Sequence, residues 1–149
     1  MRLLLRFSAI VLFCLAAPRS VSAQLEIGTW VRKSTANQPT MTLKIETCCG
    51  HIGRKLTYSL TGATMILASG MDGRDAALSV NGKPTGETMA ITRVDAHHAT
   101  TVIKMNGAKI GTSTATLSDD GKTLTIESEL TTAAGGNRAG KQTEVWVKQ

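Results

Sequence analysis

Apolar and polar residues alternate in short stretches along most of the chain. Leu43 and Ile45, for example, alternate with Lys44 and Glu46, and the same pattern recurs over residues 123–130. A period of two is typical of β-strands that have one buried face, and no window of helical length shows a clear period of 3.6 residues. The pattern therefore predicts an all-β protein.

Turn signals separate these alternating stretches. Asn-Gly and Asp-Gly pairs begin at residues 72, 81, 106 and 120, and such pairs tolerate the positive φ that tight hairpins require. The abundant threonines also favour strands, because a branched Cβ fits a pleated surface. We expect ten strands, near residues 25–33, 40–48, 54–61, 64–69, 75–81, 87–94, 99–105, 108–117, 122–130 and 141–148.

Consecutive strands joined by short turns form a meander, which either exposes two long edges or closes on itself. Closure removes the exposed edges and with them the risk of aggregation. We therefore predict a single antiparallel up-and-down β-barrel of 8–10 strands, with a two-sheet β-sandwich as the alternative. No break in composition divides the chain, which indicates one domain.

The N-terminus has the features of a secretory signal peptide. Arg2 and Arg6 precede an apolar run over residues 7–17, and small residues at 21–23 suit a signal peptidase. The run is too short to span a bilayer, so we expect no stable membrane insertion. We expect residues 1–23 to be removed, leaving a barrel domain over residues 24–149 that is secreted or periplasmic.

Cys14 leaves one alternative open at the N-terminus. Bacterial lipoproteins carry a leucine three residues before the modified cysteine, with small neighbours. Val11 stands at that position here, and the bulky Phe13 suits the peptidase poorly.

Charge and aromatic content exclude one class of partner. The net charge of +6 falls to +3 without the predicted signal peptide, because Arg2, Arg6 and Arg19 leave with it. Both phenylalanines leave too, so Trp30, Tyr58 and Trp146 are the remaining aromatic residues. Nucleic-acid binding needs basic patches interleaved with aromatic side chains, and no basic run exceeds two residues. We expect no nucleic-acid partner.

Several short motifs resemble those of one family. The Gly-Thr-Trp at residues 28–30 is similar to the Gly-x-Trp signature of lipocalins and fatty-acid-binding proteins, the calycin group. The chain more specifically resembles small secreted bacterial lipocalin-like proteins, through residues 42–46, 93–96, 118–125 and 144–149. The resemblance covers most of residues 28–149.

This resemblance implies a barrel of eight to ten strands in which Trp30 closes one end, with Gly28 allowing the indole to pack close to the backbone. The chain also departs from fatty-acid-binding proteins, which commonly end with an Arg-x-Tyr that holds the ligand carboxylate. Glu144 and Trp146 stand in that stretch, and residues 34–39 leave no room for a helical lid. We therefore do not expect fatty-acid binding in that style.

Small residues near 108–117 indicate space inside the barrel, since a filled barrel needs bulky side chains. Depending on the strand register, the inward positions are Thr112, Thr114 and Thr116, or Gly111, Ser113 and Ala115. We expect the barrel to bind a small apolar or amphipathic molecule. The candidate ligand contacts are Tyr58, Trp146, Thr112 and Thr114. A barrel filled by methionine, leucine and isoleucine, with no ligand, is the alternative.

Cys48 and Cys49 are adjacent and lie beside Gly50 and His51. Three interpretations remain open: two free thiols, a vicinal disulfide that stiffens a turn, and a soft-metal site for Cu(I) or Zn(II) with His51. The adjacent His97 and His98 are expected to form a solvated hairpin tip.

The motifs of known catalytic sites do not occur. The chain lacks Gly-x-Ser-x-Gly, His-Glu-x-x-His and a phosphate-binding loop, so we expect no enzyme and no cofactor. A second hypothesis is an envelope protein that binds a protein partner, or inhibits a protease, through its outer surface, with residues 132–137 as an interaction loop.

Overall fold

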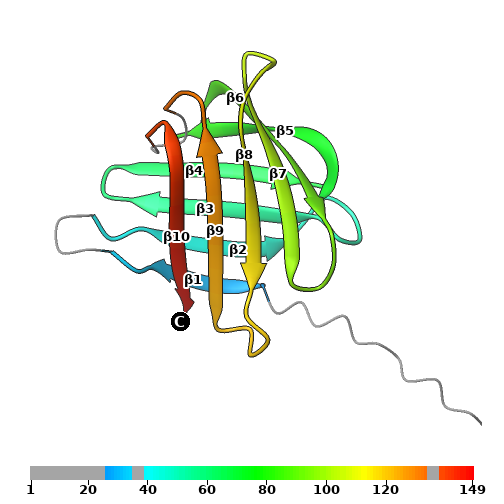
Figure 1. The fold of residues 1–149 in the computed structure, drawn as a ribbon, viewed down its shortest axis with the longest axis vertical. Coiled ribbons are helices and arrows are strands. Elements are labelled where there is room, and N and C mark those ends of the chain that lie inside the picture. Colours follow the sequence, from blue (N-terminus) through cyan, green and yellow to red (C-terminus); the bar gives the residue numbers. More distant parts are fainter. Residues whose placement is uncertain (1–25, 35–38, 134–137) are drawn as a thin grey trace, which may run out of the picture.

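Ten strands follow one another along the chain, and each pairs with its sequence neighbours in antiparallel orientation (Figure 1). The computed structural model describes residues 26–34, 39–133 and 138–149, so the predicted signal peptide lies outside the described residues. The strands are β1 (Gly28–Arg32), β2 (Thr42–Thr47), β3 (Arg54–Leu60), β4 (Ala63–Ser69), β5 (Asp72–Val80), β6 (Lys83–Arg93), β7 (His98–Met105), β8 (Ala108–Leu117), β9 (Thr123–Leu130) and β10 (Gly140–Lys148).

The first and last strands pair with each other and close the sheet into a barrel. Trp30 lies opposite Lys148, and Arg32 lies opposite Trp146. The prediction of an up-and-down barrel is therefore confirmed, at ten strands, and the two-sheet sandwich is excluded. Among the described residues, no helix is long and apolar enough to cross a membrane.

Two of the predicted hairpin turns have the expected backbone. Asn81 and Gly82 have φ values of 49° and 77°, and Asn106 and Gly107 have 48° and 84°. Positive φ at both central residues defines the type I′ turn, whose twist matches that of the flanking strands. These turns set the pairing of β5 with β6 and of β7 with β8.

The prediction of a turn at residues 72 and 73 is wrong. Both residues lie within β5, where the pairing register with β6 shifts between Asp72 and Asp75. Gly73, at φ 82°, thus occupies a β-bulge. The chain reverses one step earlier, at Gly70 and Met71, and Met71 has a positive φ of 59°.

The register of β8 decides which small residues face the interior. Ile110 and Leu117 are both buried although they are an odd number of positions apart. A register shift opposite Ile103 and Lys104 leaves Ile110 without a partner on β7 and reverses the alternation there.

Beyond Ile110, Ser113 and Ala115 therefore face inward, whereas Thr112 and Thr114 are exposed on the outer surface. The expectation that Thr112 and Thr114 contact an internal ligand is corrected by this register.

The two tryptophans lie in the largest core cluster. Both are fully buried, and they pack with Leu43, Leu117 and Leu124. The Trp30 Nε1–H donates a hydrogen bond of 2.9 Å to the Glu26 carbonyl. This bond ties the residues before β1 to the barrel core.

Gly28 is needed for a different reason than the one expected. It has a φ of 139°, and a Cβ built there would lie 2.8 Å from the Lys148 Cε. The Lys148 ammonium in turn lies 5.4 Å from the centre of the Trp30 ring. Glycine is therefore required here by its backbone conformation and not by the indole, since the flexible Lys148 side chain could move aside.

Candidate functional site

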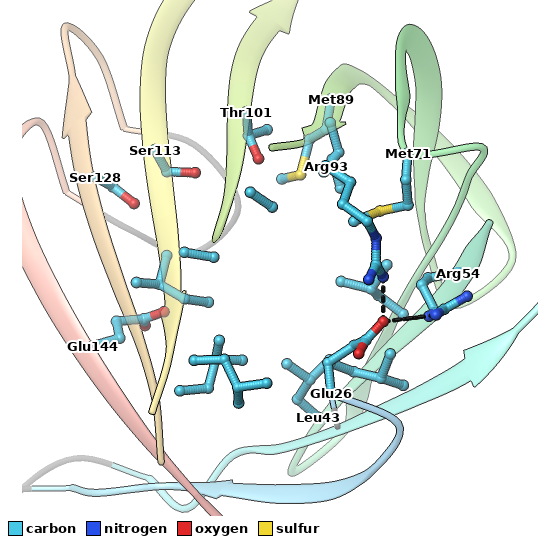
Figure 2. A pocket seen from close by; sticks show the side chains of 18 of the residues that line it. Glu26, Leu43, Arg54, Met71, Met89, Arg93, Thr101, Ser113, Ser128 and Glu144 are labelled. Carbon is cyan, nitrogen blue, oxygen red and sulfur yellow. Dashed lines mark hydrogen bonds and ion pairs between the residues drawn. The ribbon is translucent and has the colours of Figure 1, made fainter. Parts of the chain in front are cut away.

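A cavity of about 190 Å³ lies inside the barrel (Figure 2). Most of its wall is apolar and comes from strands all around the barrel, with Leu56, Met65, Leu78, Met89 and Ile126 among the lining residues. For comparison, an engineered apolar cavity of about 150 Å³ admits benzene. The space exists because small side chains, among them Ala99, Ser113 and Ala115, stand at inward positions where bulky ones would fill it.

An ion cluster lies at one end of the cavity, where the chain enters β1. The Glu26 Oε1 accepts from Arg54 Nε at 2.8 Å and lies 2.7 Å from Arg54 Nη2. Arg93 Nη2 donates to the same oxygen, as Figure 2 shows. Arg54 is almost fully buried, at 3% exposure of its side chain. Glu26 therefore connects β3 and β6 across the end of the barrel, which we call the Glu26 end.

The same arginine also holds the loop before its own strand. Arg54 Nη1 donates to the carbonyls of Ile52, at 3.0 Å, and Gly53, at 2.8 Å. Each of the three guanidinium nitrogens thus has an acceptor within hydrogen-bond distance, which favours the burial of this arginine.

Burial desolvates the Glu26 carboxylate and acts to raise its pKa. The hydrogen bonds from Arg93 and Arg54 outweigh that effect, so the pKa lies below its ordinary value of 4.5. Glu26 is thus ionised at neutral pH.

A second internal ion pair joins β10 to β1. Arg32 Nη1 lies 2.9 Å from Glu144 Oε1, and both side chains are mostly buried. Glu144 lines the cavity together with Tyr58. Burial raises the pKa of the Tyr58 hydroxyl, and the nearby Glu144 raises it further, so Tyr58 stays protonated and can donate a hydrogen bond.

Three hydroxyl groups line another part of the wall. Thr101, Ser113 and Ser128 face the cavity from the adjacent strands β7, β8 and β9 (Figure 2). Thr101 lies directly opposite Ser113, and Ser113 lies directly opposite Ser128. We call these three residues the hydroxyl row.

The β6–β7 loop borders the cavity at the Glu26 end. The expectation that His97 and His98 form a solvated hairpin tip is correct for one of them only. His98 is exposed and its Nδ1 lies 2.9 Å from Asp95, but His97 is half-buried, with Nδ1 3.1 Å from the Leu117 carbonyl. The backbone N–H of His97 and the His98 side chain lower the pKa of Asp95. Both histidines and Asp95 line the cavity.

Cys48 and Cys49 form a vicinal disulfide in the β2–β3 loop. Of the three interpretations of this pair, the structure contains the disulfide, and in that state neither sulfur is a thiolate ligand for a metal. Cys49 has a φ of 56° and Gly50 a φ of 100°, so the loop turns sharply at the disulfide. Among the described residues, no group of three or more metal-ligating side chains comes together.

The four residues expected to contact a ligand lie in three different places: at the cavity, on the outer surface of the barrel and in the packed core. Tyr58 lines the cavity, whereas Thr112 and Thr114 lie outside it. Trp146 is fully buried in the core, where its ring meets that of Tyr58 edge-on at 5.9 Å, and it does not line the cavity. The interaction loop expected at 132–137 falls partly outside the described residues, because 134–137 are not among them.

Sequence reasoning missed the charged residues of the wall, although a signal for them exists. Arg54 stands two positions before Leu56, and Arg93 two positions after Ile91, so both continue the inward face of a strand. A charge in phase with buried apolar residues indicates an internal ion pair. Their partner Glu26 gives no such signal, because it precedes the first strand.

Comparisons with known proteins support the fold. No protein-family model matches the chain, and no curated protein sequence matches it significantly. Among solved structures, the chain is similar to a mutant of the fluorescent protein UnaG, with 12% identity and a TM-score of 0.58, over 85% of this chain and 97% of the other. The fold thus defines a closed antiparallel β-barrel protein with an internal cavity, in agreement with the barrel that the calycin resemblance implies.

The ion cluster predicts how stability depends on pH. Replacing Glu26 by Gln should lower the free energy of unfolding at pH 7 by about 2 kcal/mol, because two charge-assisted hydrogen bonds lose their anion. Since the pKa of Glu26 is lowered in the folded state, its contribution is fully present above the ordinary value of 4.5 and is lost as the pH falls below it. Urea unfolding of both proteins from pH 7 to pH 3 measures this difference.

The exposed Glu129→Gln serves as the control and should leave the free energy of unfolding unchanged. A difference between the wild type and E26Q that grows on acidification, or that is absent at pH 7, would contradict the assigned role of Glu26.

The disulfide predicts the reactivity of the cysteines. The protein with residues 1–23 removed, prepared without reductant and then unfolded, should not react with a thiol reagent such as Ellman's reagent. After reduction with a phosphine, two thiols should react, because Cys48 and Cys49 are its remaining cysteines. Two reactive thiols in the unreduced protein would restore the free-thiol and metal-site interpretations.

Proposed function

We propose that this protein is exported and binds a small apolar or amphipathic molecule, without covalent bonding and without catalysing a reaction. The observation that carries this proposal is the 190 Å³ cavity in the middle of the barrel, with its largely apolar wall. An apolar ligand placed there would gain about 25 cal/mol for each Å² of its surface that leaves water.

The barrel is suited to this task because its cavity is formed in advance. Strands on all sides hold the wall, and closure by β1 and β10 fixes their relative positions. A preformed site spares the ligand the cost of ordering the protein. The hydroxyls and ion pairs on the wall supply the few polar groups that orient a ligand in such sites.

Export is supported by the pattern of residues 1–23 and agrees with the vicinal disulfide. Disulfides persist in oxidising compartments and are rare where thiols are kept reduced. The proposed location is secreted or periplasmic.

Binding can be measured with toluene as a minimal apolar probe. With 13C-labelled methionine methyl groups, toluene should shift the signals of Met65, Met71 and Met89, which line the cavity, and leave Met105 outside it unaffected. Ala115→Leu should weaken toluene binding by about tenfold or more, because the added carbons occupy the cavity.

Ala68→Leu is the matched control, since Ala68 is exposed on β4 and the substitution is chemically the same. This variant should bind toluene like the wild type. Failure of toluene to bind the wild-type protein, or equal binding by A115L, would rule out the cavity as the binding site.

Export is tested on protein recovered from its own host. Its intact mass should correspond to a chain that begins at Gln24, and the protein should be found in the periplasmic or secreted fraction. A full-length mass would contradict export by this signal, and a lipid-modified chain that begins at Cys14 would instead establish the lipoprotein alternative.

A further inference from the structure

The hydroxyl row is a line of hydrogen-bonding groups on an otherwise apolar part of the wall. Figure 2 shows Thr101, Ser113 and Ser128 with their oxygen atoms toward the cavity. Directly opposite residues on neighbouring antiparallel strands have Cβ atoms about 4.5–5.5 Å apart. The three hydroxyls therefore follow one another around the barrel at regular spacing.

These hydroxyls have no hydrogen-bond partner within the part of the chain that the structure describes. The buried Ser69 on β4 differs in this respect, because its Oγ accepts from the Met71 N–H at 3.1 Å. The row is thus free to bond with whatever occupies the cavity, and a serine or threonine hydroxyl can either donate or accept.

Two acidic groups of the wall, in contrast, are engaged with arginines. Glu26 holds Arg54 and Arg93, and Glu144 holds Arg32. An anionic ligand group would compete with Glu26 and Glu144 for these arginines, and it would also lie near the buried Glu87, which lines the same cavity. A neutral polar group bonds to the hydroxyl row without this competition.

We propose that the hydroxyl row recognises a neutral apolar molecule through a hydroxyl or carbonyl oxygen, an inference that rests on the proposed function. An oxygen placed between two neighbouring hydroxyls of the row lies about 2.7–3.0 Å from both, which is hydrogen-bond distance. The body of the molecule packs against the apolar wall, including Leu43 and the adaptable Met71.

Three probes that share one benzene ring test this selectivity: phenol, toluene and benzoate. Phenol and toluene differ by a hydroxyl in place of a methyl group, and benzoate carries a negative charge. The variant Thr101→Val, Ser113→Ala, Ser128→Ala removes the row with little change of shape. It should bind phenol about fivefold to tenfold more weakly than the wild type, since it loses one or two hydrogen bonds. It should bind toluene equally well or more tightly.

The control variant Thr112→Val, Thr114→Val removes two hydroxyls from the outer face of the same β8 strand. It should bind all three probes like the wild type. Ser113→Ala alone is the mildest change and should weaken phenol binding by about twofold to threefold. This variant keeps the test valid if the triple variant folds poorly. Methionine methyl shifts report the dissociation constants.

The outcomes separate this inference from the proposed function. If the triple variant loses affinity for phenol and toluene equally, or for neither, the hydroxyl row does not have the proposed role. Toluene binding by the wild type would still support the cavity as the binding site. Benzoate binding more tightly than phenol would overturn the preference for a neutral ligand. Failure of both phenol and toluene to bind the wild type would instead refute the proposed function itself.

Discussion

The pairing of β1 with β10 is the constraint on which the rest of the structure depends. It gives every strand two neighbours, so the backbone hydrogen bonds of the sheet have no open edge. Along each strand, alternate residues must then face either solvent or a shared interior. The interior can be filled with side chains or left partly open, and small residues on β7 and β8 leave it open.

The polar groups inside the barrel divide into two kinds with different consequences. Glu26 connects the non-adjacent strands β3 and β6, and the pair of Glu144 with Arg32 joins the neighbouring strands β10 and β1, but a buried pair is weak evidence for net stabilisation. Their effect on binding is clearer, because they occupy the arginines with which an anionic ligand would otherwise pair. A neutral ligand can instead use the apolar side chains and the hydroxyl row, and this combination is the basis of the proposed selectivity.

Much of the fold could be predicted from the sequence, and part of the site could not. The Asn-Gly pairs at 81 and 106 and the period of two were sufficient for ten strands and a barrel. The inward face of β8 was ambiguous because Ile110 and Leu117 require opposite phases, and only the register shift against β7 decides between them. Glu26 was missed because its contacts with Arg54 and Arg93 depend on the closed barrel and leave no local pattern.

The central claim is that the barrel interior holds an apolar cavity that a small molecule can enter. A crystal structure determined under xenon pressure tests it most directly, since xenon enters apolar cavities of this size without help from polar groups. The account predicts xenon density inside the barrel, within contact distance of Leu56, Met65 and Met89. An interior filled by side chains, with xenon absent from it, would contradict the account.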